Sequence, residues 1–211
     1  TKKVLAAAGL PVAPEVILKG RTELSEEEKQ HLGLPVFVKP ARGGSSIGVS
    51  KVNSWEEFPA AVDLALEDDE KILVEPEIVG QEVEIGVLHY ADGTLLASVP
   101  ALLAGIDDSD EGFYGFDTKY LDNVVTAEIP APFTPELTEK LRDMAVRAFE
   151  ALNCEGLSRV DFFVTEDSVY INEINTLPGF TPISMYPQVL AASGVEYPAL
   201  LEALIEQALA K

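Results

Sequence analysis

The chain has 211 residues, of which 47% are hydrophobic and 24% are charged, and its formal net charge at pH 7 is −21. This composition excludes a disordered or fibrous protein, a single cysteine (Cys154) excludes an internal disulfide framework, and no apolar run approaches the about 18 residues that a membrane span needs. The negative charge argues against nucleic acid and anionic membrane as partners, so any anion site has to be local and built from few cations. We therefore expect a globular, cytoplasmic protein with neither kind of partner.

The first third of the chain predicts helices and strands separated by short loops. A helix is expected over residues 1–8, and β-branched or aromatic runs predict strands over residues 35–40 and 48–52. Asn53 or Ser54 is then expected to cap an amphipathic helix. Its apolar residues recur at helical spacing: Trp55, Phe58, Val62 and Leu66.

The middle of the chain is richer in strands. Residues 71–78, 82–90 and 94–99 predict strands, and the last two form a hairpin around the turn "ADG". Residues 100–122 carry glycine and aspartate without a period, which predicts a long loop.

The last third again mixes both kinds of element. Thr134 is expected to cap a helix that runs to about Leu152, because apolar residues follow the helical period there. Strands are predicted over residues 157–164 and 169–175, and a final helix follows Pro198.

The stretch "VKPARGGSSIGVSK", residues 38–51, is a basic segment in an acidic chain. It lies between two predicted strands and contains neither the GxxxxGK pattern of a Walker loop nor the GxGxxG pattern of a Rossmann loop. Adjacent glycines let backbone N–H groups approach an anion, serine hydroxyls add donors and Lys39 adds a point charge, which favours a phosphate-binding flap. The alternative is a flexible hairpin without a ligand. Nothing in the pattern assigns a role to Arg42.

A second group of polar residues lies on the last predicted hairpin. A three-residue loop at 166–168 would set Asp161 opposite Glu173 and Arg159 opposite Asn175, all on one face. Two carboxylates and an amide oxygen suit Mg²⁺, and an adjacent arginine could stabilise charge on a transferred group. The alternative is a solvent-facing hairpin end with an arginine–glutamate pair.

Five stretches, in this order, resemble the motifs of a known family: "VKPARGGSSIGVSKV", "LVEPEIVGQEVEIGVL", "FYGFDTKYLD", "LSRVDFF" and "INEINTLPGFTPISMYP". With them the chain resembles the ATP-grasp superfamily and, within it, the D-alanine–D-alanine ligase family. The resemblance implies an α+β fold in which two subdomains sandwich a nucleotide. Residues 1–79 would form the first, with the glycine and serine flap. Residues 80–211 would form the second, with the magnesium and phosphate site and a lid loop at 100–122.

The resemblance also implies roles for individual residues. The nucleotide contacts would be Lys39, Ser46 and Lys119 for the phosphates, Glu75, Glu77 and Ile78 for adenine, and Glu82 for the ribose. Tyr120 would help to fix Ser45 near the first D-alanine. Asp161, Glu173 and Asn175 would bind Mg²⁺, as two ions, with Mn²⁺ as an alternative. Arg159 and the N–H groups around Gly179 would stabilise the adduct. Ser184 and Met185 would bind the carboxylate of the second D-alanine. The implied reaction joins two D-alanines through an acyl phosphate, in peptidoglycan and cell-wall synthesis.

The chain also departs from the family. The family has an N-terminal domain that supplies part of the first-substrate site, and this sequence has no counterpart of it. That domain would be either a separate chain or a removed segment. We therefore expect this chain to be an ATP-binding portion with an incomplete first-substrate site. A homodimer is expected from the family. The apolar stretch "SVPALLAG", residues 98–105, is expected to expose apolar surface or to pack against something absent. Two other interpretations stay open: a nucleotide-binding module without turnover, and a structural domain that has lost its nucleotide site.

Overall fold

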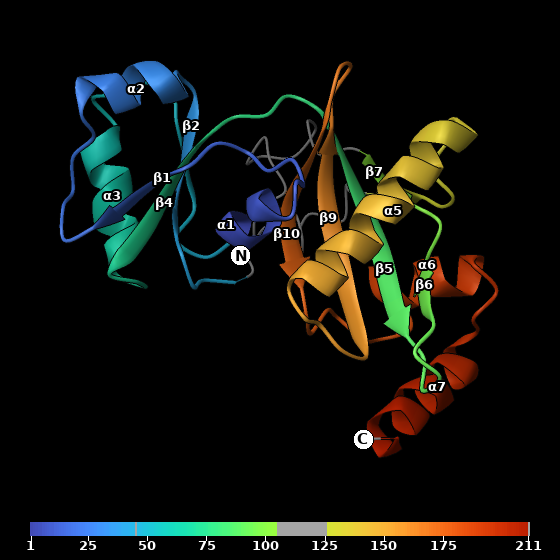
Figure 1. The fold of residues 1–211 in the computed structure, drawn as a ribbon. Helices are drawn as coiled ribbons and strands as arrows, with labels where there is room; N and C mark the ends of the chain where they lie inside the picture. The colour runs from blue at the N-terminus through green and yellow to red at the C-terminus, as the bar shows by residue number, and fades with distance from the viewer. Residues whose placement is uncertain (45, 105–125, 211) are drawn as a thin grey trace. The chain divides into compact units, whose positions relative to one another are not determined.

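The computed structural model describes residues 1–44, 46–104 and 126–210, shown in Figure 1. They fall into two compact units. Residues 13–78 form one, which we call the four-stranded unit, and residues 1–12, 79–104 and 126–210 form the other, the six-stranded unit.

The first twelve residues belong to the six-stranded unit, whereas the sequence grouped them with the first subdomain. Leu5 and Leu10 are buried in the core of that unit. The backbone N–H of Ile171 donates to the carbonyl of Pro11 at 2.9 Å, so the segment also joins the sheet edge. Near the middle of the chain the division falls between Ile78 and Val79.

The four-stranded unit is an antiparallel sheet with two helices. Its elements are β1 (Val16–Lys19), α2 (Glu26–Leu32), β2 (Val36–Pro40), β3 (Ser50–Val52), α3 (Phe58–Leu66) and β4 (Lys71–Pro76), with strand order β1-β4-β2-β3. Alternate residues of the strands are buried, as on β2, where Val36 and Val38 face the core and Phe37 and Lys39 face away. One face of the sheet therefore packs on α3, and the other face carries the polar residues.

Helix α3 starts later than its apolar pattern predicts. The expected side-chain cap at Asn53 or Ser54 is wrong, because the helix begins at Phe58 with Glu57 at the N-cap. Pro59 explains the shift: it lacks a backbone N–H, so it fits the first turn of a helix and not the interior. The carboxylate of Glu57 accepts hydrogen bonds from the backbone N–H groups of Asn53 and Ser54, at 2.9 and 3.3 Å.

The six-stranded unit is a larger sheet covered by helices on both faces (Figure 1). Its strand order is β10-β9-β5-β7-β8, with β6 paired to β5. The strands are β5 (Gln81–His89), β6 (Leu95–Ala97), β7 (Ala101–Ala104), β8 (Thr126–Glu128), β9 (Leu157–Val164) and β10 (Val169–Asn175). The helices are α1 (Lys2–Ala7), α5 (Pro135–Ala151), α6 (Met185–Ala192) and α7 (Tyr197–Leu209).

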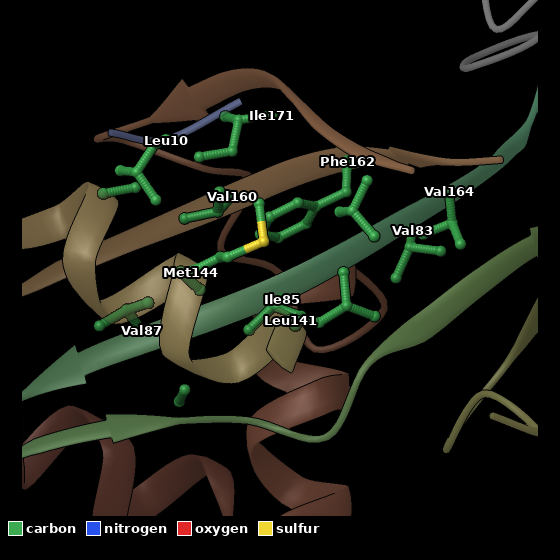
Figure 2. Close-up of a cluster of buried hydrophobic side chains, with 14 of the residues drawn as sticks. Leu10, Val83, Ile85, Val87, Leu141, Met144, Val160, Phe162, Val164 and Ile171 are labelled. Carbon is green, nitrogen blue, oxygen red and sulfur yellow. The ribbon is translucent and has the colours of Figure 1, made fainter. Parts of the chain in front are cut away.

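Helix α5 forms the main core with one face of this sheet. The hydroxyl of Thr134 accepts from the N–H of Leu137 at 3.3 Å, which confirms the predicted cap. Its buried residues repeat at helical spacing: Leu141, Met144, Ala145, Ala148 and Phe149. Figure 2 shows this cluster, in which Met144 of α5 lies among Val160 and Phe162 of β9.

Helix α6 covers the opposite face, over β5. The side chains of Tyr186 and Leu190 are fully buried there, and the Tyr186 hydroxyl donates to the carbonyl of Val87 at 3.1 Å. Gly86 provides the space, since a Cβ at this position would lie 2.5 Å from Leu190 Cδ2. Arg159 and Asp161 of β9 lie on the same face of the sheet as Gly86, because they pair with Gly86 and Glu84 of β5.

The hairpin of β9 and β10 has the predicted facing pairs, although its turn differs from the expected one. Asp161 pairs with Glu173 and Arg159 pairs with Asn175. At the turn end, however, Val169 pairs with Val164, so the loop has four residues. A register shift between Ile171 and Glu173 restores the predicted pairing at the polar end.

Two expectations for the stretch after the β5–β6 hairpin need correction. The hairpin itself is confirmed, since Leu88 pairs with Leu96. The expected loop at 100–122 begins with strand β7, which pairs with β5 and β8; residues 105–122 lie outside the described residues. Residues 100–103 of "SVPALLAG" are buried within the unit, and Ala101 and Leu102 pack in its two hydrophobic clusters. None of the helices in the described part of the chain is long and apolar enough to cross a membrane.

Gly86→Ala should destabilise the six-stranded unit. The new methyl group would lie 2.5 Å from Leu190 and 3.0 Å from the Tyr186 ring, so we expect the free energy of unfolding to fall by about 1–3 kcal/mol. Urea denaturation measures this loss. The control is Gly44→Ala, because no heavy atom of the described residues lies within 4 Å of a Cβ there, and we expect a change within about 0.5 kcal/mol. Equal losses in both variants would contradict the packing described for Gly86.

Candidate functional site

Three neighbouring strands of the six-stranded unit place polar side chains in two rows on the face that α6 covers. In the register, Glu84 of β5 lies opposite Asp161 of β9, which lies opposite Glu173 of β10. In the next row Gly86 lies opposite Arg159, which lies opposite Asn175. Because strand residues two apart share a face, these rows form one polar surface beside the apolar contact with α6.

Arg159 is the centre of this surface. Its Nε and Nη2 donate to the two carboxylate oxygens of Asp161, both at 2.7 Å, and Nε lies 3.1 Å from Glu84 Oε2. Burial by itself would lower the pKa of the guanidinium. The hydrogen bonds to Asp161 and the charges of Asp161, Glu84 and Glu173 outweigh burial, so the pKa of Arg159 is raised above its ordinary value.

The three residues predicted to bind a metal converge beside it. The amide Nδ2 of Asn175 donates to Asp161 Oδ2 at 2.9 Å and approaches Glu173 Oε1 at 3.4 Å, so one amide group joins both carboxylates. Hard oxygen donors on Asp161, Glu173 and Asn175 fit Mg²⁺ in their chemistry. Among the described residues, no group of three or more His, Cys, Asp or Glu is arranged to hold a metal ion. A metal site here would therefore need the amide oxygen of Asn175 as its third ligand, beside the carboxylates of Asp161 and Glu173.

Glu84 belongs to this surface although the sequence did not single it out. Its side chain is 4% exposed. Glu84 lies directly opposite Asp161 on β9, and its Oε2 reaches Arg159, which lies two residues away from Asp161 on the same strand. The signal was the pattern "EVEIGV", in which Glu82 and Glu84 occupy the same face of one strand. What the pattern lacks is the position of β9, which lies more than seventy residues further along the chain.

The loop before α6 presents the residues expected at the second substrate. Ser184 is the N-cap of α6 and Met185 its first residue. Ser184 Oγ accepts from the N–H of Thr181 at 3.1 Å, and a Cβ on Gly179 would lie 3.0 Å from the same oxygen. Phe180 anchors the loop, because its ring packs on Tyr186 with 5.9 Å between the centroids. Gly179 and Ser184 are therefore close, at the start of a helix of eight residues.

In the four-stranded unit, the polar face of the sheet carries lysine–glutamate pairs. Lys39 Nζ lies 2.7 Å from Glu75 Oε2, and Lys51 Nζ lies 2.6 Å from Glu77 Oε1. The Glu75 side chain is 8% exposed and that of Lys39 is 27% exposed, so the lysine is the member that solvent can reach. An anion that binds Lys39 would therefore compete with a carboxylate.

The other predicted nucleotide residues are distributed over both units. Ile78 follows β4, and Ser46 lies in the loop between β2 and β3 with a positive φ of 57°. Glu82 lies on β5 of the six-stranded unit, opposite Phe163. Three predicted residues lie outside the described residues: Ser45, Lys119 and Tyr120.

Two α+β units with this arrangement of strands and polar residues define the ATP-grasp class of fold. A family model described as "D-ala D-ala ligase C-terminus" matches residues 4–206, and the chain belongs to that family. The predicted resemblance is thus confirmed.

Named relatives agree with this assignment. The D-alanine–D-alanine ligase of Corynebacterium efficiens is 66% identical over 99% of this chain, and that of Mycolicibacterium smegmatis is 52% identical over 100% of this chain. Among solved structures, the D-alanine–D-alanine ligase of Coxiella burnetii superposes with a TM-score of 0.83 at 36% identity, over 99% of this chain and 55% of that one. A VanG D-Ala:D-Ser ligase of Enterococcus faecalis gives 0.84 at 33% identity, over 97% of this chain and 59% of that one. The chain spans 58% and 57% of the length of the Corynebacterium efficiens and Mycolicibacterium smegmatis relatives.

Glu84→Gln should cost stability through Arg159. The substitution keeps the shape of the side chain but removes a negative charge beside a largely buried guanidinium, so we expect the free energy of unfolding to fall by about 2 kcal/mol. Urea denaturation at pH 7 measures the loss. The matched control is Glu139→Gln, whose side chain is 69% exposed and also pairs with an arginine, Arg142; we expect a loss of less than about 1 kcal/mol there. Equal losses would show that the buried pair has no special role.

Proposed function

We propose that the chain is the ATP-binding and catalytic portion of a D-alanine–D-alanine ligase. The observation that carries this proposal is the cluster of Arg159, Asp161, Glu173 and Asn175 on adjacent strands. Membership of the ligase family and the likeness to a D-alanine–D-alanine ligase of Bacillus anthracis complexed with ATP, with a TM-score of 0.80 at 26% identity, support it.

The proposed nucleotide is ATP, and its contacts are those that the family resemblance implies. Lys39 and Ser46 would hold the phosphates, helped by Lys119 from outside the described residues. Glu75, Glu77 and Ile78 would contact adenine, and Glu82 the ribose. The exposure of Lys39 supports the phosphate role, since its ammonium group can exchange Glu75 for a phosphate oxygen.

Asp161, Glu173 and Asn175 would hold Mg²⁺, as two ions or with Mn²⁺ in their place. The metal, when bound, would offset negative charge on the transferred phosphoryl group. Arg159 would add a fixed positive charge at the same surface, and its raised pKa supports this because the guanidinium stays protonated. Gly179 would contribute backbone N–H groups, and Ser184 and Met185 would bind the carboxylate of the second D-alanine.

The proposed reaction has two steps. An oxygen of the first D-alanine carboxylate attacks the γ-phosphorus of ATP, ADP leaves and an acyl phosphate forms. The deprotonated amine of the second D-alanine then attacks the acyl carbon, phosphate leaves and a peptide bond forms. Tyr120 and Ser45 would help to hold the first D-alanine, and exclusion of water would protect the acyl phosphate. The dipeptide would serve peptidoglycan synthesis in the cytoplasm.

The length of the relatives bears on the activity of this chain. We propose that a segment beyond the matched part of the relatives completes the first-substrate site and contributes to a homodimer. The chain by itself would then bind nucleotide with little turnover, which is the behaviour of the alternative function, a nucleotide-binding module.

Phosphate release coupled to D-alanine tests the ligase proposal. We expect the 211-residue chain to release little phosphate and a chain extended by the relatives' further segment to release it in a D-alanine-dependent way. No D-alanine-dependent release from either chain would contradict the ligase function. Equal release from both would contradict the need for the further segment.

Lys39→Ala should weaken nucleotide binding. Loss of a charge that contacts phosphate should raise the dissociation constant of ATP with Mg²⁺ at least about tenfold, as measured by titration calorimetry. Lys29→Ala is the control, since Lys29 lies in the same unit and pairs with Glu26 on the surface. The proposed phosphate contact fails if the two variants bind ATP equally well.

A further inference from the structure

Arg42, to which the sequence assigned no role, forms a two-pronged contact with Asp69. Its Nε donates to Asp69 Oδ2 at 3.0 Å and its Nη2 to Oδ1 at 2.7 Å. The Arg42 side chain is 72% exposed, whereas that of Asp69 is only 3% exposed. A bidentate contact to a buried carboxylate is stronger than an ordinary surface ion pair, because the carboxylate has lost its water.

Asp69 is itself fixed to the turn between α3 and β4. Its Oδ1 also accepts from the backbone N–H of Lys71 at 3.1 Å. The hydrogen bonds from Arg42 and from Lys71 lower the pKa of Asp69 to about 2, so it is ionised at neutral pH. Arg42 thus joins the start of the glycine-rich loop to a carboxylate that cannot move independently of β4.

Further contacts tie the loop to the same turn. The backbone N–H of Ala41 donates to the carbonyl of Lys71 at 2.9 Å. At the far end of the loop, Gly48 has a φ of +71° and approaches Asp68 and Pro40 so closely that a Cβ would lie 2.7 Å from Asp68 Oδ2. Both ends of the loop therefore rest on residues 68–71 or on Pro40. Gly43 also lies against Pro40, whereas no heavy atom of the described residues lies within 4 Å of a Cβ on Gly44.

From these contacts we infer that Arg42 is a positioning residue, which fixes the root of the loop to Asp69 and so orders its backbone N–H groups for phosphate. It does not itself contact the phosphate. The inference rests on the proposed nucleotide site, and it separates the cations of the loop by role. Lys39 pairs with Glu75 and would exchange this partner for phosphate, and Arg42 holds the Asp69 carboxylate, which also accepts from the backbone N–H of Lys71.

Two substitutions with opposite effects on charge test the inference. If Arg42 positions the loop, Arg42→Gln and Asp69→Asn break the same contact, and each should raise the dissociation constant of ADP with Mg²⁺ about fivefold, because the loop then spends less time in the binding arrangement. The double variant should be no weaker than either single one. If Arg42 contacts phosphate directly, Arg42→Gln weakens binding while Asp69→Asn leaves it unchanged or strengthens it. That result would overturn the inference.

Matched variants separate positioning from a general loss of stability. Arg21→Gln removes another bidentate arginine–carboxylate contact of the same unit, that with Glu28, and should lower the melting temperature without changing the affinity for ADP. Arg42→Lys keeps the charge but loses the fork geometry, so it should restore the affinity only in part. A lower melting temperature with unchanged affinity in both Arg42→Gln and Asp69→Asn would also overturn the inference.

Hydrogen exchange tests the anchoring even without nucleotide binding. The backbone amides of residues 41, 47 and 49 should exchange several-fold faster in Arg42→Gln and in Asp69→Asn than in the unsubstituted chain. If the unsubstituted chain binds no ADP, the proposed function fails, while faster exchange would still support Arg42 as the anchor. Unchanged exchange in both variants would overturn the anchoring itself.

The pH dependence should follow Asp69. A carboxyl group whose pKa is about 2 when folded and near its ordinary 3.8 when unfolded contributes stability above pH 4 that is lost as the pH falls toward 2. Asp69→Asn lacks this contribution at every pH. The difference in urea midpoint between the chain and this variant should therefore be constant above about pH 5 and shrink toward pH 2. A difference that does not change with pH would contradict the ionised contact.

Discussion

The candidate catalytic surface depends on one arginine held between carboxylates on adjacent strands. A largely buried guanidinium is costly to desolvate, and Arg159 is stabilised because Asp161 meets it in a fork and Glu84 Oε2 lies 3.1 Å from its Nε. The arrangement requires β5 and β9 to pair in one register, since a slip by one residue would turn Glu84 away from Arg159. The apolar packing of α5 on the far face and of α6 beside the polar rows stabilises that register.

The acidity of the chain shapes its cation sites. In the glycine-rich segment, Lys39, Arg42 and Lys51 each lie within hydrogen-bonding distance of a carboxylate. Carboxylates therefore offset the positive charges of this basic stretch. A cation that binds phosphate would have to exchange its carboxylate partner for the phosphate. Arg42 holds an aspartate that also accepts from the backbone, and this second bond supports Lys39 as the cation that exchanges its partner.

Local sequence predicted many elements and one set of contacts well. The cap at Thr134 and the β5–β6 hairpin follow from side-chain chemistry and alternation, which act over a few residues. The facing of Asp161 and Glu173 was predicted from an assumed loop of three residues; the loop has four, and a register shift near residue 172 compensates. The start of α3 was misplaced because its apolar period continues upstream of Pro59, whose missing N–H sets the first turn.

The sequence by itself determined the family, the polar residue types and their order along the chain, because motifs and alternation are local properties. Only the tertiary structure decided which charges meet. Glu84 joins Arg159, Asp69 joins Arg42 and residues 1–12 join the larger sheet through contacts between segments that are far apart in the chain. No local pattern encodes such pairs, since burial and distance arise from the packing of whole elements.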